Sequence, residues 1–508
     1  MRRNVLCVPF LALTIAVSVM AQQPAGVGLR LIVVKTEEEA VGLRSRLQAG
    51  ERFEDLAKKY STDASASAGG YFGNWLIGDL RKEFLDALDG LRPGQVSPIV
   101  KISETYVLLQ VVTEAEAHYY LGYELAGQGK LDEAIGEFLN ALRLNPDYAE
   151  THTSVGNVLG LQGKWDEAIA EHREALRINP QYDEAHNSLG IALLEQGNVE
   201  EAIAEYREAL RINPQYAEAH YNLGNALDDQ EKLDEAMGEY REALRINPEY
   251  AEAHYNLGVA LKSQGKVGEA VKEYREALRI NPSLAEAHYA LGRVLDVGGK
   301  LDEAIAEYRE ALRIFPNYDE AHYNLGVALT DQGKLDEAIA EYREALRVNP
   351  HYAAAYNNLG VALKEQGKLD EAIAEYREGL RVNPNYVMLH YNLGVAFKDQ
   401  GKLDEAVEEY HGALRINPSY PEAHNNLGIA LSDQGKLDEA IAEYREAVRI
   451  NPGFAPVRYN LGEALRQQGD RAGAAREFRD FLRLAPTSPE SEEKIEHARS
   501  ILAELDKS

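Results

Sequence analysis

Apolar and small residues recur with a period of 34 positions from Ala115 to Ser488, in eleven units without an insertion. A period of this length is typical of stacked helical hairpins. The unit Asp319–Tyr352 illustrates the pattern, because its apolar positions have helical spacing on both sides of the polar turn Gln332–Lys334. These positions are Leu325, Leu329, Ile339, Tyr342 and Leu346. The pattern predicts two helices in each unit, packed on each other and on the next unit.

Three columns of the repeat never vary. Glycine occupies the eighth place of each unit and alanine the twentieth, where we expect the two helices of a hairpin to cross closely. Proline occupies the thirty-second place and should end the second helix, because it lacks the backbone N–H that a helix interior needs. These columns resemble the tetratricopeptide repeat. The resemblance covers residues 115–488 and implies a mainly α, right-handed TPR solenoid that binds other proteins.

The C-terminal end of the array has the features of a solenoid end. In the last unit, Phe481 replaces the small residue of the twenty-seventh place. The segment Glu490–Leu505 then reads as a charged amphipathic helix. We therefore predict a capping helix and tail over residues 489–508.

Histidine occupies the fourth place in nine of the eleven units, for example His322 and His390. A row of histidines could be a row of metal ligands. Packed helices lie about 8–10 Å apart, however, which is too far for successive histidines to share one ion. We therefore predict that the column serves packing and that the chain has no metal site.

The tetratricopeptide resemblance implies that the first helix of each hairpin lines a concave groove. Tyrosine recurs at the fifth place and asparagine at the sixth, and both should face this groove. An amide both donates and accepts, so the asparagines could hold an extended backbone without reading its side chains. Alternatively, these amides bond within the array. The groove residues predicted in this way are Tyr221, Asn222, Tyr255, Asn256, Tyr323, Asn324, Asn358, Tyr391, Asn392, Asn426, Tyr459 and Asn460.

Residues 27–112 precede the repeats and read as a small α+β domain. The β-rich runs are Arg30–Val34, Tyr71–Trp75 and Thr105–Val112. Helical spacing is found at Glu37–Gln48, Phe53–Tyr60 and Arg81–Gly90. Thr113, with Glu116 three places on, predicts a capping box at the start of the first repeat helix. We therefore expect a rigid junction without a flexible linker.

The order of landmarks in this domain resembles the parvulin-type, PpiC-like peptidyl-prolyl isomerase family. The landmarks are Val33–Lys35, Phe53–Ala57, Tyr60–Asp63, Gly69–Gly70, Gly73, Glu83–Phe84, Leu91–Gly94, Val96–Ser97 and Tyr106. Such enzymes rotate X-Pro bonds, which isomerise slowly without a catalyst. The resemblance implies Asp63 as the catalytic candidate, at the family's acidic-or-thiol position. It implies Leu80, Phe84 and Trp75 as the substrate-binding candidates, around an apolar proline pocket.

This sequence departs from the family pattern at the polar positions. Leu31 and Val107 stand where the family has histidines, and Glu104 stands where an aromatic residue is usual. One interpretation is a degenerate domain that binds X-Pro peptides or only caps the array, within a scaffold or chaperone-like factor. The alternative is an active peptidyl-prolyl cis-trans isomerase to which the array brings clients, since rotation about the bond needs no proton transfer.

The first 21 residues resemble a secretory signal peptide. Arg2 and Arg3 precede the apolar stretch Val5–Met20, which is short for a membrane span, and small residues precede Gln22 at the usual cleavage spacing. We expect an exported protein in the periplasm or outside the cell, with an uncleaved anchor as the alternative. The only cysteine, Cys7, would be removed with the signal.

A formal net charge of −29 disfavours partners that carry many phosphates. We therefore expect no nucleic-acid partner and no membrane insertion after signal cleavage. The expected ligands are proteins or extended peptides, neutral to basic and proline-containing in the isomerase interpretation. The alternative is that the charge only keeps a long array soluble. No phosphate loop or cysteine cluster occurs, so no cofactor is expected.

Overall fold

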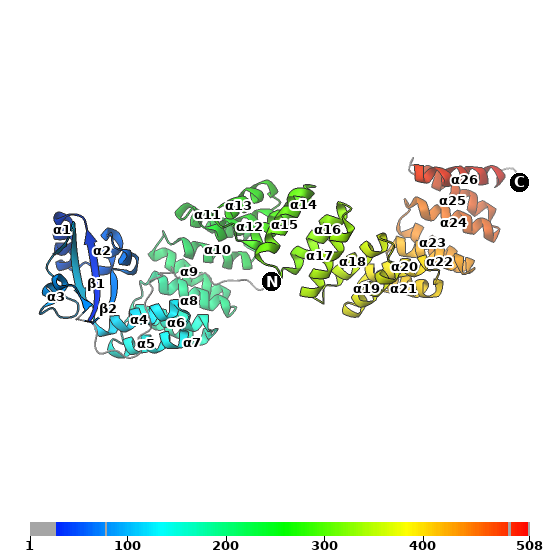
Figure 1. Cartoon of the computed structure of the whole chain (residues 1–508). Coiled ribbons are helices and arrows are strands. Elements are labelled where there is room, and N and C mark those ends of the chain that lie inside the picture. The colour runs from blue at the N-terminus through cyan, green and yellow to red at the C-terminus, as the bar shows by residue number, and fades with distance from the viewer. Residues whose placement is uncertain (1–26, 77–78, 486–488, 506–508) are drawn as a thin grey trace. The chain divides into compact units, whose positions relative to one another are not determined.

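The computed structural model describes residues 27–76, 79–485 and 489–505 (Figure 1). The predicted signal peptide, residues 1–21, lies outside the described residues. The chain divides into two compact units, residues 1–260 and 261–508. The first contains the α+β domain and the first repeats, and the second contains the later repeats. Among the described helices, none is both long and apolar enough to cross a membrane.

A four-stranded antiparallel sheet forms the centre of the α+β domain, with strand order β2-β1-β4-β3. Its elements are β1 (Val27–Val34), α1 (Glu37–Gln48), α2 (Phe53–Tyr60), the short 3-10 helix η1 (Ala64–Ala68), β2 (Tyr71–Trp75), α3 (Lys82–Leu88), β3 (Val100–Ile102) and β4 (Thr105–Val111). The predicted helices and all three predicted strands are confirmed to within a few residues. The three-residue β3 was not predicted, because so short a run carries no clear alternation.

The two faces of the sheet pack against different helices. On one face, Ile32 and Leu108 contact residues of α1 and α2 in a closed apolar core. On the other face, Leu31, Val107 and Leu109 form a core with residues of α3. This arrangement follows from the alternation of side chains along β1 and β4, which sends neighbouring residues to opposite faces.

Eleven helical hairpins follow, as the 34-residue period predicts. Their helices are α4 (Glu114–Gly127), α5 (Leu131–Leu144), α6 (Ala149–Leu161), α7 (Trp165–Ile178), α8 (Asp183–Glu195), α9 (Val199–Ile212), α10 (Ala217–Asp229), α11 (Leu233–Ile246), α12 (Ala251–Ser263), α13 (Val267–Ile280), α14 (Ala285–Val297), α15 (Leu301–Ile314), α16 (Asp319–Asp331), α17 (Leu335–Val348), α18 (Ala353–Glu365), α19 (Leu369–Val382), α20 (Val387–Asp399), α21 (Leu403–Ile416), α22 (Pro421–Asp433), α23 (Leu437–Ile450), α24 (Ala455–Gln468) and α25 (Arg471–Leu484). The TPR α-solenoid is therefore confirmed.

The invariant glycine and alanine lie where the two helices of a hairpin meet. In the seventh repeat, a methyl group added to Gly326 would come within 2.6 Å of the Tyr342 ring, so no side chain fits there. Ala338 is fully buried on the facing helix. Gly333 makes the turn between α16 and α17 with a φ of +73°, a conformation that glycine adopts without strain.

The α+β domain contacts the first repeat through a buried arginine. Arg30 on β1 is 3% exposed and pairs with Glu54 of α2 at 2.6 Å and with Glu116 of α4 at 2.9 Å. Its guanidinium also donates to the Tyr120 hydroxyl at 2.8 Å. The predicted capping box is present, since Thr113 and Glu116 bond each other's backbone N–H groups at the start of α4. These contacts join β1 directly to α4.

The last helix, α26 (Pro489–Leu505), packs on α25 as predicted for a capping helix. Ala498 and Ile501 are its buried residues, at 0% and 6% exposure. Phe481 of α25 is also buried, and its ring lies 5.3 Å from that of Tyr459. The larger residue at this place therefore fills the end of the array.

Candidate peptide-binding sites

The face of the sheet that carries the family's histidine positions is apolar in this chain. Leu31 and Val107 lie 3% exposed in one core with Val100 and Leu109. Phe84 of α3 packs against the same core. No titratable group therefore lies at either of these positions, which belong to the apolar core between the sheet and α3.

Asp63 begins the 3-10 helix η1, and its Oδ1 accepts a hydrogen bond from the Ser65 N–H at 2.8 Å. The segment before it is bonded to β1, because Thr62 N–H donates to the Val33 carbonyl at 2.8 Å. Gly70 closes the segment with its carbonyl accepting from the Leu31 N–H at 2.7 Å. Asp63 is thus held beside the strand that carries Leu31, in the role of a helix cap.

The three predicted substrate-binding residues lie together. Trp75, Leu80 and Phe84 contact one cluster with Leu29 and Val111 of the sheet. Phe84 belongs to both this cluster and the one around Leu31, so the two apolar surfaces are continuous. The Trp75 indole N–H donates to the Phe72 carbonyl at 3.0 Å, which fixes its ring in a stacked pair with Phe72.

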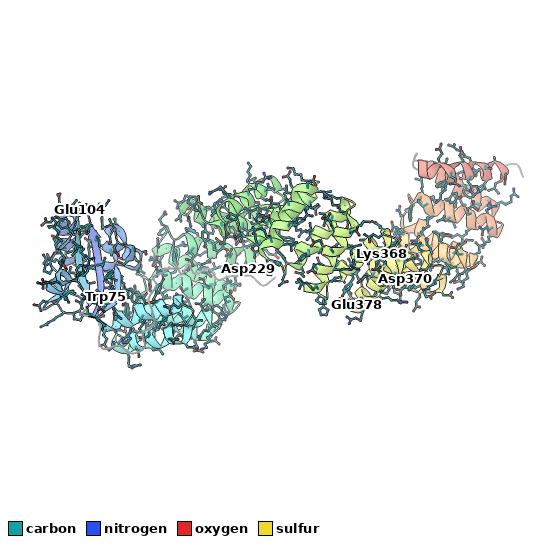
Figure 2. The ribbon with its side chains drawn as sticks, in the orientation of Figure 1. Trp75, Glu104, Asp229, Lys368, Asp370 and Glu378 are labelled. Carbon is teal, nitrogen blue, oxygen red and sulfur yellow. The ribbon has the colours of Figure 1, made fainter. Side chains whose placement is uncertain are left out.

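Glu104 does not belong to this apolar surface. It lies exposed in the tight turn between β3 and β4, next to Ser103, whose φ is +56°. Figure 2 shows Glu104 and Trp75 at opposite ends of the sheet. The loss of the usual aromatic residue at this place therefore leaves the Trp75–Leu80–Phe84 cluster intact.

In the repeats, the asparagines of the sixth place bond within the array. Asn358 Nδ2 donates to the Tyr323 hydroxyl of the preceding repeat at 3.1 Å, and Asn426 does the same to Tyr391 at 3.0 Å. In repeats whose fifth place is asparagine, the Oδ1 of that asparagine is the acceptor. Asn392 Nδ2, for example, donates to Asn357 Oδ1 at 2.8 Å. The same bond is made by Asn222, Asn256, Asn324 and Asn460.

This ladder limits what the predicted groove residues can offer a ligand. One amide hydrogen of each asparagine is used between repeats, as the second of the two sequence interpretations expects. Most tyrosines of the fifth place are half-buried. Tyr323 packs on Tyr352, the last residue of its own repeat, with ring centroids 4.7 Å apart. Tyr221 and Tyr391 pack in the same way, and Tyr255 and Tyr459 are also half-buried. Asn256 and Asn324 also use their second amide hydrogen within the array, on Asn225 Oδ1 at 2.7 Å and on the Glu320 carbonyl at 2.8 Å. Exposed ring edges and the second amide hydrogens of the other ladder asparagines are left for a ligand.

The histidine column is occupied by contacts within the array. His322 Nδ1 lies 2.6 Å from the Glu341 carboxylate, and its Nε2 lies 3.1 Å from the Pro316 carbonyl of the preceding repeat. In the last repeat Arg458 replaces histidine and bonds Glu477 and Pro452 in the same manner. Each histidine of this kind thus links the two helices of a hairpin to the preceding repeat, which is the packing role predicted.

One feature of the groove lies outside the tyrosine and asparagine rows. The tyrosine–asparagine pair is absent from the second repeat (149–182) and the third (183–216), which have Thr153–Ser154 and Asn187–Ser188 instead. A cavity of about 250 Å³ opens at this interruption. The signal in the sequence is the break in the rows, together with Trp165 at a place that is aliphatic in most repeats and His172 at a place that is tyrosine or phenylalanine in the others.

Residues 33–113 match the family model of the PPIC-type PPIASE domain. Two groups of curated relatives match this N-terminal region. Foldase protein PrsA of Bacillus subtilis is 40% identical over 85 residues, which are 16% of this chain and 29% of that protein. Chaperone SurA of Burkholderia thailandensis is 34% identical over 115 residues, which are 22% of this chain and 26% of that protein. The chain thus spans less than a third of the length of these relatives.

Among solved structures, one similar chain is YrrB, described as a TPR protein with an unusual peptide-binding site. It is 26% identical, with a TM-score of 0.32 over 36% of this chain and 95% of that one. Tetratricopeptide repeat models match residues 255–319, 298–342 and 457–488. The TPR repeat model matches residues 122–163, 156–197, 192–230, 224–265, 328–367, 362–401, 396–435 and 430–469. Because that model alone matches more than half of the chain, the chain belongs to the tetratricopeptide repeat family, and it carries a PPIC-type peptidyl-prolyl isomerase domain before the repeats.

Proposed function

We propose that the chain is a chaperone-like binding scaffold whose repeats hold client proteins or extended segments while the small domain binds X-Pro peptides. The observation that carries this proposal is the apolar surface of the partly exposed Trp75 and Phe84, which packs on Leu80 and, through Phe84, on the buried Leu31 and Val107. A prolyl ring is apolar and fits such a surface. The same surface lacks the histidines of the family, so binding is favoured over efficient catalysis.

Active isomerisation is the second candidate function. The family match over residues 33–113 and the 40% identity to a foldase support it. Rotation about the X-Pro bond breaks no covalent bond, so an apolar site that binds the twisted form more tightly accelerates it without an acid or base. Clients held by the array would also meet the small domain at a raised effective concentration.

The test is cis–trans exchange in a short Ala-Pro peptide, followed by NMR with the full chain added in small amounts. Peptide signals that shift without faster exchange support the binding scaffold. Faster exchange supports the isomerase. In either case Phe84→Ala should remove the effect, and Phe315→Ala, at an exposed position in a repeat loop, should not. No shift and no faster exchange would contradict both roles of the small domain.

We also propose that the mature chain is exported and begins at Gln22. Arg2, Arg3 and the apolar stretch after them support this. The mass of the protein isolated from its host decides the matter, because cleavage removes the first 21 residues. A chain of full mass recovered with membranes would instead indicate the uncleaved anchor.

A further inference from the structure

The cavity at the interruption of the tyrosine–asparagine rows is lined by the first helices of the first three repeats, by residues of α5 and α7, and by the start of α10. Thr153, Ser154 and Ser188 occupy places where most later repeats have the larger tyrosine and asparagine. The space that the tyrosine and asparagine side chains fill in those later repeats is open here. A volume of about 250 Å³ suits one long side chain and is small for a drug-sized ligand.

Aromatic rings and two carboxylates line this cavity, which we call the acidic pocket. Tyr182, Tyr216 and Trp165 supply rings, and Glu184 and Glu218 supply the carboxylates. The Tyr182 hydroxyl donates to Glu184 at 3.1 Å. Within the described ranges no lysine, arginine or histidine forms an ion pair with Glu184 or Glu218, although most acids on the second helices of the repeats have such a partner.

A buried, unpartnered side chain lies at the floor of the acidic pocket. His172 takes the place that tyrosine or phenylalanine occupies in the other repeats, and it is 2% exposed beneath Gly156. Its Nδ1 has no hydrogen-bond partner among the described residues. Burial lowers the pKa of His172 to about 3, so the ring is neutral and has one acceptor nitrogen.

The pocket therefore combines negative charge, hydrogen-bond acceptors and aromatic faces. A guanidinium group is complementary to all three, because it is cationic, has five N–H donors in a plane, and stacks on aromatic rings. An ammonium group matches the charge but has only three donors and does not stack. A carboxylate or phosphate would be repelled by Glu184 and Glu218.

We propose that the acidic pocket binds a single arginine side chain of an extended client segment and so sets the register of the client along the repeats. This inference rests on the proposed function in one respect, since it requires that the array accept extended segments. It goes further because it states which kind of client side chain is bound and where. The place is in the first three repeats, outside the tyrosine and asparagine rows.

The experiment is a titration of the full chain with two peptides that differ at one residue. Both are short and extended and have no other charged group, and the central residue is arginine in one and citrulline in the other. Citrulline keeps the planar shape and loses the charge. Charge-assisted hydrogen bonds are about twice as strong as neutral ones, so we expect the arginine peptide to bind about tenfold more tightly. A lysine peptide should fall between the two.

The double variant Glu184→Gln and Glu218→Gln should abolish this difference. The matched control is Glu252→Gln with Glu286→Gln, since these glutamates occupy the same place of the fifth and sixth repeats. Trp165 reports binding at the pocket itself. In a Trp75→Phe background it is the only tryptophan, so the arginine peptide should change its emission.

Other outcomes would overturn the inference. Equal affinity for arginine and citrulline, or an arginine preference that the double variant leaves unchanged, would show that the pocket does not read the guanidinium. If neither peptide binds while a permanently unfolded client protein does, the pocket has no such role and the proposed function stands. If the unfolded client is not bound either, the proposed function fails as well.

Discussion

At the scale of single residues, the repeat is defined by positions where nothing larger fits. Gly326 faces the Tyr342 ring at a distance that excludes a methyl group, and Ala338 is fully buried beside it. Because protein interiors are packed to crystal density, such positions tolerate extra atoms poorly. The same contact recurs from repeat to repeat, for example between Gly428 and Tyr444. The invariance of these two columns along the chain therefore has a steric cause.

We expect Ala338→Leu to destabilise the protein by about 1–3 kcal/mol, because three extra carbon atoms must be forced into the hairpin crossing. Urea unfolding measures the change. Ala340→Leu is the matched control, since Ala340 lies exposed on the same helix, and it should change stability little. Equal effects of the two substitutions would mean that the crossing is looser than the burial of Ala338 indicates.

The acidic pocket should respond to pH through Glu218. Burial, and then the charge of Glu184, raises the pKa of Glu218 to about 7, while an amide hydrogen bond from Asn187 opposes the shift. Glu218 is therefore ionised above pH 7 and neutral below it. Tyr216 lies just before the helix that carries Glu218, and His172 stays neutral throughout. Affinity for the arginine peptide should fall several-fold between about pH 8 and pH 6. In Glu218→Gln the profile should be flatter.

At the scale of helices, side-chain bonds between neighbouring repeats add to apolar packing. The asparagine ladder joins successive first helices, and the fourth-place histidines join each hairpin to the proline loop before it. Both partners of His322, the Glu341 carboxylate and the Pro316 carbonyl, are acceptors. Only the doubly protonated ring can donate to both at once. The charged form is thus the one that the folded array accommodates.

This arrangement predicts a pH-dependent stability. Burial lowers the pKa of His322, but the bonds to Glu341 and Pro316 outweigh it and raise the pKa above 6.5. The pKa values of His390 and His424 are also raised. A raised pKa in the folded state means that the stabilisation is present below about pH 6.5 and is lost as the pH rises through the folded value. We expect a loss on the order of 1 kcal/mol per bridge.

Replacing these three histidines by arginine tests the origin of that loss. Arginine stays charged, and Arg458 already makes the equivalent bonds in the last repeat. The triple variant should keep the stability that the natural chain has near pH 6 and lose less of it near pH 8, as followed by urea unfolding. His351 lies exposed in a repeat loop, so His351→Arg should leave the pH profile unchanged. Parallel profiles of the natural chain and the triple variant would refute the bridge explanation.

The junction between β1 and α4 depends on Arg30. Its removal leaves Glu116 without its cation in a half-buried place and leaves Glu54 only the longer ion pair with Arg52 at 3.6 Å. Breaking a buried ion pair from one side costs about 3–5 kcal/mol. Arg30→Ala should therefore destabilise the small domain and expose residues 111–117 to protease, whereas the exposed Arg92→Ala should not. Rapid cleavage of the unaltered chain in this segment would contradict a rigid junction.

At the scale of the whole chain, the features that depend on the 34-residue period could be predicted from the sequence. The features that depend on how one repeat packs against the next could not. The 34-residue columns predicted the hairpins and the turn at Gly333, and the amphipathic segment after them predicted the capping helix. The bond from Asn358 to Tyr323 could not be deduced, because it depends on how far one repeat turns against the next. The acidic pocket was missed for a related reason. The rows of tyrosine and asparagine indicate a groove only where these residues recur, and the acidic pocket lies where the rows stop.

The charge of the chain makes a last prediction about its clients. The net charge of −29 is spread along the repeats, and the unit Asp319–Tyr352 alone has seven acidic and three basic residues. If this charge attracts clients and does not serve solubility alone, a basic unfolded client should bind more weakly as salt rises, because the Debye length falls from about 10 Å at 0.1 M to about 3 Å at 1 M. Fluorescence anisotropy with a labelled client measures this. The same client with its lysines and arginines replaced by glutamine should bind with little salt dependence. Affinities that ignore both salt and client charge would assign the acidity to solubility and leave the repeats to recognise clients by shape and hydrogen bonding.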